Sequence, residues 1–221
     1  MKIDITRPVD REQWLETLHV KGNADSRLME SLQEAERILL KEAGPKAVYR
    51  LMDRQLFHSE GFSIEKHLEG CHKVIIMGLT LGSGVDSLIR RTQITDMPTA
   101  VLIDAGASVL IEQLADEYQR YRCDSLAETE GGVGNIYTTS RFSPGYGDYP
   151  VTEQMRVLRY LDAGRKIGLT VTAESLMVPR KSITAVMGLS DRPVTGRPAT
   201  CGECVLKDKC ELRKEGKFCG D

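Results

Sequence analysis

The chain has few aromatic residues, no long apolar run and no excess of charge of either sign. Aromatic side chains make up 5% of its 221 residues, and 30 basic against 32 acidic side chains give a formal net charge of −2. Such a balance provides no overall attraction to nucleic acid or to an anionic membrane. No apolar stretch approaches the roughly 20 residues of a membrane-spanning helix, and residues 1–8 lack the apolar core of a secretion signal. We therefore expect a cytoplasmic protein that binds neither nucleic acid nor membrane.

What is present is the composition of a globular protein. Hydrophobic residues make up 41% of the chain and charged residues 28%. A chain of this length buries roughly 70% of its surface on folding, so that an ordinary core forms without disulfides. Beyond Ser190 the sequence becomes polar and contains Pro193 and Pro198. We expect one domain over residues 1–190, followed by a linker and a cysteine-rich tail over residues 191–221.

Hydrophobic patterning predicts a mixture of helices and short strands. The helices are expected over residues 26–43, from Pro45 to about Leu56, around Leu88 and Ile89, from Met97 to about Tyr121 as a mostly buried helix, and over residues 152–163. The strands are expected at residues 3–5, 74–79, 169–172 and 182–187. The strands are short and unlike connections separate them, which is not the regular rhythm of a doubly wound parallel sheet. We therefore predict a mixed α/β (α+β) fold with a twisted, largely antiparallel sheet and packed helices.

The segment from Arg141 to Pro150 has an unusual composition for a connector. Its ten residues include three aromatics, two glycines, two prolines and one arginine, and they exclude a helix. Glycine lets a ligand approach the backbone, a Tyr ring stacks on a purine or faces a cation, and Arg binds a carboxylate with two hydrogen bonds. S-adenosylmethionine offers an adenine, a sulfonium and a carboxylate. The alternative interpretation is a rigid surface turn with packed rings.

A longer pattern surrounds this segment. Leu81-Gly82 and Asp86 precede it, and a helix follows it before Leu169-Thr170, Met177-Val178-Pro179, Ser182 and Gly188. Together with Arg141-Phe142-Ser143-Pro144-Gly145-Tyr146, this pattern resembles the C-terminal reactivation domain of cobalamin-dependent methionine synthase over most of residues 1–190. The resemblance implies an activation-domain-like fold that binds S-adenosylmethionine. It also implies the remethylation of cob(II)alamin after a one-electron reduction.

The resemblance implies which residues bind S-adenosylmethionine. In the loop they are Arg141, Ser143, Gly145 and Tyr146. Ser143 stands where the family often has Ala, and a backbone contact tolerates that exchange. Asn135 stands where the family has an acidic residue before the loop, and Met187 stands near a family Tyr.

Glu112 is a further candidate, in the predicted long helix. Val109 and Ala115 flank it at helical spacing, and burying an unpaired carboxylate costs several kcal/mol. The resemblance implies that Glu112 faces the ligand, as an acidic residue of the family's matching helix does. Helical spacing alone supports equally a solvated stripe that Glu112 shares with Ser108 and Asp116.

Four of the six cysteines crowd the end of the chain. Cys201 and Cys204 form a C-x-x-C pair, and Cys210 and Cys219 follow. Four thiolates complete a tetrahedral zinc site or hold an iron–sulfur cluster. The irregular spacing suits an iron–sulfur cluster slightly better than zinc but does not decide between them, and thiols that form a transient disulfide or bind nothing are a third interpretation. By contrast, Gly82-Ser83-Gly84 lacks the complete pattern of a phosphate-binding loop.

These observations lead to one preferred function and one alternative. The preferred hypothesis is a free-standing, methyltransferase-type reactivation protein that acts on a partner in trans, either a cobalamin-binding methionine synthase or another corrinoid protein. An electron donor such as a flavodoxin or ferredoxin supplies the reduction, and a cluster in the tail would deliver or gate that electron. No general base is evident, so no catalytic residue is assigned. The alternative is a non-enzymatic interaction or electron-transfer module that carries a metal or iron–sulfur cluster on the same scaffold.

Overall fold

The protein has a mixed α/β fold in which antiparallel sheet and helices pack together. The computed structural model describes residues 2–20, 24–130 and 136–194. The helices are α1 (Arg11–Thr17), α2 (Ser26–Glu42), α3 (Phe62–His67), α4 (Ser83–Thr95), α5 (Met97–Glu130), α6 (Gln154–Leu161) and α7 (Ala163–Ile167), with short 3-10 turns η1 (Arg54–Leu56) and η2 (Val151–Glu153). The strands are β1 (Lys46–Asp53), β2 (Lys73–Thr80), β3 (Tyr137–Thr138), β4 (Thr170–Val171), β5 (Met177–Val178) and β6 (Ser182–Ser190). The predicted fold class is confirmed.

The main sheet has the strand order β1-β2-β6-β3, and β4 pairs with β5 in a separate hairpin. Backbone bonds at the strand ends show the directions: Gly44 pairs with Leu81 while Arg54 pairs with His72. As the chain advances from residue 44 to residue 54, the bonded partner moves back from residue 81 to residue 72. The strands β1 and β2 between these bonds are therefore antiparallel. Nearly every residue of β2 and β6 is buried, so these two central strands carry the core.

The described residues divide into two compact units that interleave along the chain. Unit 1 comprises Met1–Val48, Gly78–Ser125 and Leu161–Ile183, and unit 2 comprises Tyr49–Met77, Leu126–Tyr160 and the described part of Thr184–Asp221. The unit boundaries cut across β1, β2, β6 and α5, and they also separate Leu161 from the rest of α6. Each unit is described by itself below.

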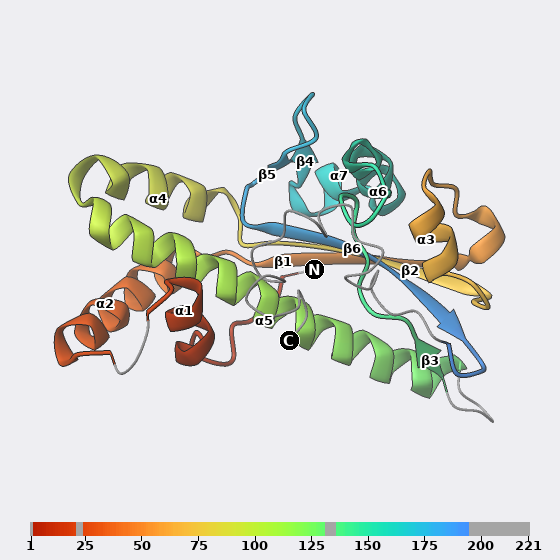
Figure 1. Cartoon of the computed structure of the whole chain (residues 1–221), viewed down its shortest axis with the longest axis horizontal. Helices are drawn as coiled ribbons and strands as arrows, with labels where there is room; N and C mark the ends of the chain where they lie inside the picture. The colour runs from red at the N-terminus through yellow and green to blue at the C-terminus, as the bar shows by residue number, and fades with distance from the viewer. Residues whose placement is uncertain (1, 21–23, 131–135, 195–221) are drawn as a thin grey trace. The chain divides into compact units, whose positions relative to one another are not determined.

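In unit 1, α1, α2 and α4 gather around the N-terminal half of α5 (Figure 1). Trp14 of α1 is fully buried, and its indole Nε1 donates to the carbonyl of Leu102, 3.0 Å away. A Cβ on Gly106 would lie 2.4 Å from the Trp14 ring, so this close approach requires glycine. Length and composition alone would let α5 cross a membrane, yet half of its apolar window is buried inside the fold. That burial is typical of a core helix.

Unit 2 contains α3, α6 and β3 around an aromatic core. Phe57, Phe142 and Tyr149 are each about 1% exposed. Phe57 also packs against Tyr160, with ring centroids 5.5 Å apart. Most of the buried aromatic residues among the described residues therefore lie in this unit. They support the loop that forms the candidate site.

Two predicted elements were wrong. The helix expected from Pro45 to about Leu56 is β1, because residues 46–53 pair with β2 and this pairing overrides the helix-start preference of proline. The strand expected at residues 3–5 is reduced to a single bridge between Lys2 and Lys46. Helix α5 also continues to Glu130, nine residues beyond the predicted end at Tyr121.

Candidate functional site

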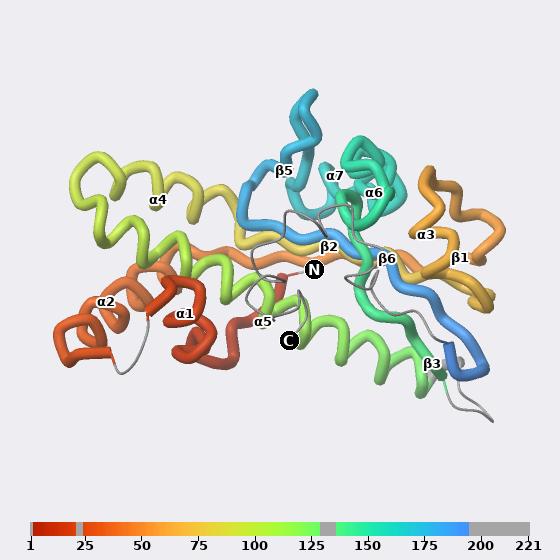
Figure 2. The backbone as a smooth tube through the Cα atoms, in the orientation of Figure 1, coloured from red at the N-terminus to blue at the C-terminus, as the bar shows by residue number. Residues whose placement is uncertain are grey.

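The segment Arg141–Pro150, called the Arg141 loop below, lies in unit 2 between β3 and α6. At its start, Phe142 and Val186 of β6 exchange two backbone hydrogen bonds of 3.0 and 2.8 Å. The Ser143 hydroxyl donates to the carbonyl of Thr184 over 2.6 Å. The loop therefore runs alongside β6 (Figure 2). The sheet thus fixes the first residues of the loop, although these residues belong to no strand.

The middle of the loop is a tight turn. Gly145 has a φ of 103°, which L side chains rarely adopt. Its N–H donates to the carbonyl of Tyr149 over 2.8 Å, and the Tyr146 N–H donates to the carbonyl of Ser143 over 3.1 Å. A Cβ built on Gly145 would meet no atom of the described residues within 4 Å. The backbone at Gly145 is therefore both fixed and open to an approaching molecule.

Aromatic rings form the base of the loop. The buried Phe142 ring stacks on His67 and on Tyr149, with centroids 4.6 and 6.1 Å apart. The Tyr146 ring lies tilted over Phe142 at 5.8 Å and remains 53% exposed. His67 Nε2 in turn lies 3.0 Å from the carbonyl of Ser140. Tyr146 thus presents ring surface to the outside from a rigid support.

Asp148 connects the loop to α3. Its carboxylate accepts from the backbone N–H groups of Phe62 and Ser63, at 2.9 and 2.7 Å. Hydrogen bonds from Ser63, and then from Phe62, hold the pKa of Asp148 below its ordinary value. Gly61 at the start of α3 has no side chain to cap the helix, and Asp148 serves as its cap instead.

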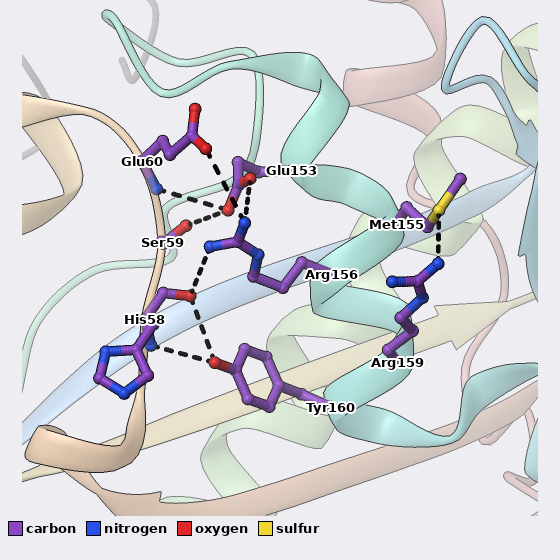
Figure 3. Close-up of polar contacts among 8 residues, drawn as sticks. All are labelled: His58, Ser59, Glu60, Glu153, Met155, Arg156, Arg159 and Tyr160. Atoms are coloured by element: carbon purple, nitrogen blue, oxygen red, sulfur yellow. Dashed lines mark hydrogen bonds and ion pairs between the residues drawn. The ribbon is translucent and has the colours of Figure 1, made fainter.

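A polar cluster joins η2 and α6, which follow the loop, to residues 58–60 (Figure 3). The buried Glu153 carboxylate accepts from the Ser59 hydroxyl at 2.9 Å and pairs with Arg156 at 3.4 Å. The Tyr160 hydroxyl accepts from the N–H of His58 and donates to its carbonyl. Beside this cluster, burial raises the pKa of Tyr149 to about 12.

The structure brings four of the predicted ligand residues together in one loop. Gly145 and Tyr146 are exposed, while Arg141 and Ser143 are partly buried. Glu112 belongs to unit 1, on the exposed side of α5. Asp116 shares this exposed side, whereas Val109 and Ala115 are buried.

The predicted metal ligands Cys201, Cys204, Cys210 and Cys219 lie outside the described residues, as does Asn135. Within the described ranges, no group of three or more His, Cys, Asp or Glu side chains is placed to hold a metal ion. The cysteine site therefore stays a prediction.

Sequence reasoning missed the residues that support the loop. His67, Asp148 and Glu153 act on partners that lie 73 to 94 positions away in the chain, so local patterns do not indicate them. One signal was available, since a helix that starts after Gly61 needs a cap from elsewhere.

Two comparisons with known proteins found a similar family model and a similar fold. Residues 92–193, which include α5, the Arg141 loop and β6, match the family model described as "Vitamin B12 dependent methionine synthase, activation domain". The fold is similar to that in a crystal structure of the MetH reactivation domain bound to AdoHcy, with a TM-score of 0.60 and 16% sequence identity. That match covers 92% of this chain and 80% of the other. No curated protein matches the sequence.

The fold is thus that of a methionine synthase reactivation domain. Within it, residues 92–193 carry the sequence pattern of the activation domain.

Proposed function

We propose that the protein binds S-adenosylmethionine at the Arg141 loop and supports reductive methylation of cob(II)alamin on a separate corrinoid protein. One observation carries the proposal: the loop is fastened to β6 and α3, yet Gly145 and the Tyr146 ring face outward. Two comparisons support it. The loop lies inside the segment that matches the activation-domain family, and the similar MetH structure is described as bound to AdoHcy.

The residues of the loop fit S-adenosylmethionine. The Arg141 guanidinium is suited to a carboxylate, and the exposed Tyr146 ring to adenine or to the sulfonium. The open space at Gly145 admits a ligand to the backbone. Because the Ser143 hydroxyl is already bonded to Thr184, Ser143 would contribute its backbone, as an alanine would. When bound, the ligand supplies a methyl group activated by the positive sulfur.

The contribution of the chain is to hold the ligand in place. The Phe142 stack and the Asp148 cap fix the loop before anything binds, which lowers the entropy that binding must remove. We assign no general base, since holding the methyl donor against its acceptor requires none. Glu112 is proposed as a second ligand contact.

The partner is proposed to be a cobalamin-binding methionine synthase or another corrinoid protein, met in the cytoplasm. A flavodoxin or ferredoxin would supply the electron. Cys201, Cys204, Cys210 and Cys219 are proposed to hold an iron–sulfur cluster or zinc. Acid-labile sulfide and metal content of anaerobically purified protein test this last assignment. The assignment is contradicted if the protein contains neither sulfide nor zinc in stoichiometric amount.

Calorimetric titration with S-adenosylmethionine tests the site. We expect one-to-one binding that Arg141→Ala weakens about tenfold or more, because a charge-assisted pair is lost. Arg159→Ala is the matched control, since Arg159 lies outside the loop and its side chain bonds to Met155 on α6. For Glu112→Gln, the control is Asp116→Asn, one turn further along the exposed side of α5. Equal binding by Arg141→Ala and the unchanged protein would contradict the assignment.

A second assay tests the reaction. S-adenosylmethionine, a reductant and candidate corrinoid proteins are combined without oxygen, and formation of methylated corrinoid is followed by its absorbance. We expect methylation only when this protein is present. Failure with every corrinoid partner, in spite of S-adenosylmethionine binding, would contradict the reaction but not the site.

One observation favours the alternative, a module that carries a metal or cluster without binding S-adenosylmethionine. Met187, near the position of a family Tyr, is fully buried in β6. A side chain in the core offers no contact to a ligand at the surface. Absence of S-adenosylmethionine binding together with stoichiometric metal in the tail would support this second function.

A further inference from the structure

A small charged pocket in unit 1 is separate from the Arg141 loop. One face of α4 lines it with Asp86, Ile89, Arg90 and Gln93, which follow the spacing of successive helical turns. Asp104 of α5 and the pair Arg180-Lys181, just before β6, complete the lining. The pocket volume is about 70 Å³. Sites for drug-sized ligands are about 300–1,000 Å³, so this pocket suits one small group.

The charges in the pocket are only partly compensated. Lys181 Nζ lies 3.0 Å from the Asp104 carboxylate and donates to the Ser108 hydroxyl over 2.8 Å. The side chains of Arg90 and Arg180 have no hydrogen-bond or ion-pair partner among the described residues, and both residues are exposed. Three basic and two acidic side chains leave one net positive charge. The pocket therefore attracts an anion.

Asp86 imposes a second condition on that anion. Its Oδ2 accepts from the backbone N–H of Arg180 over 2.8 Å. Its Oδ1 is buried and has no hydrogen-bond partner in the part of the chain that the structure describes, although a buried acceptor without a donor destabilises the folded state. A ligand that also carries a donor would satisfy this oxygen. The preferred ligand is therefore an anion that bears a proton.

We propose that this pocket binds a protonated phosphate group, either inorganic phosphate or the phosphate of a small monoester. The phosphate oxygens would accept from the Arg90 and Arg180 guanidinium groups, and the P–OH would donate to Asp86 Oδ1. Sulfate and carboxylates carry no proton near neutral pH, so either would set a second acceptor against the Asp86 carboxylate. Recognition depends on side chains rather than on the Gly82-Ser83-Gly84 turn.

Calorimetric titration of the whole chain with inorganic phosphate and with sulfate, at constant ionic strength and pH 6.5, tests the proposal. We expect saturable phosphate binding and sulfate binding that is weaker by about tenfold or more. Glycerol 3-phosphate forms a second arm, in which tighter binding than that of inorganic phosphate would identify a monoester as the ligand. Arg90→Gln and Arg180→Gln should each lower phosphate affinity about tenfold. Arg91→Gln is the matched control, because Arg91 is on the same helix but outside the pocket lining.

Asp86→Asn separates specific recognition from general attraction. Its amide can accept from the Arg180 N–H and donate to the ligand, so the variant keeps the backbone contact and should bind sulfate about as well as phosphate. Thermal unfolding shows whether each variant is folded. The proposal is wrong if phosphate does not bind. It is also wrong if phosphate and sulfate bind the unchanged protein equally, or if Arg91→Gln weakens binding as much as Arg90→Gln does.

Discussion

Two exposed connections in this protein, the Arg141 loop of unit 2 and the β4–β5 hairpin of unit 1, are held in different ways. In the hairpin the bonds are local: the Thr172 N–H donates to the carbonyl of Leu176, and the Ser175 N–H donates to the carbonyl of Thr172. Leu176, the residue before β5, is 65% exposed. The Arg141 loop instead bonds to β6 and α3 and rests on the Phe142 stack.

This difference distinguishes a connector from a preorganised surface. A hairpin needs only its own turn and ladder to join two strands. The Arg141 loop has partners more than 40 positions away in the chain, which add nothing to its role as a link. Such support is expected where a loop must keep one shape before its ligand arrives.

Removing one large apolar side chain from each connection should give the largest contrast. Phe142→Ala should lower the free energy of unfolding by about 3–5 kcal/mol, because it leaves a cavity under Tyr146 and beside Tyr149. Leu176→Ala should change it by no more than about 0.5 kcal/mol, since the side chain is exposed. Urea denaturation at pH 7 measures both. Equal effects would show that the loop is no better supported than the hairpin.

Alkaline pH tests the same aromatic support of the loop through the ionisation of Tyr149. Burial raises its pKa from 10 to about 12 in the folded protein, so the folded state keeps a proton that the unfolded state loses. The resulting stability is complete below pH 10 and disappears as pH rises toward 12, by about 2–3 kcal/mol in all. Urea denaturation between pH 8 and 11 should show the start of this loss. Tyr149→Phe should lack it, whereas Tyr121→Phe, at an exposed position, should keep it.

Ser143→Ala should have a smaller effect. The change removes the bond to the Thr184 carbonyl, which contributes about 1 kcal/mol. The backbone pair between Phe142 and Val186 remains, so the affinity for S-adenosylmethionine should stay within about threefold. A loss of binding as large as that of Arg141→Ala would show that the hydroxyl itself contacts the ligand.

Local sequence was sufficient to predict the elements whose signals are local. The buried strand at residues 74–79, the helix at residues 26–43 and the nonhelical Arg141 loop were all predicted within a few residues. The segment after Pro45 was misassigned because proline is equally compatible with a helix start and with the residue before a strand. Only pairing with β2 decides between them, and that pairing is a tertiary contact.

The candidate site shows the same limit. Composition was enough to single out the loop, because prolines, glycines and rings lie close together in the sequence. The support of the loop was not predictable, since it depends on which distant residues the fold brings next to it. His67 illustrates this: its ring stacks on Phe142, 75 positions further along the chain, and no local pattern around His67 indicates that contact.

Asp148→Asn should give the smallest effect and the sharpest pH dependence. The folded-state pKa of Asp148 is lowered by its bonds to Ser63 and Phe62, so its contribution is present above the ordinary Asp pKa of about 4 and is lost as pH falls below that value. At pH 7 we expect a loss of about 0.5–1 kcal/mol, because the carboxylate is exposed and solvent screens it. Glu174 in the hairpin also has a lowered pKa, through a bond to Thr172, but it joins only neighbours within one turn. Glu174→Gln should therefore leave urea denaturation curves unchanged from pH 3 to 7. If Glu174→Gln and Asp148→Asn changed the free energy of unfolding equally, the long-range cap on α3 would contribute no more to stability than the local bond in the hairpin turn.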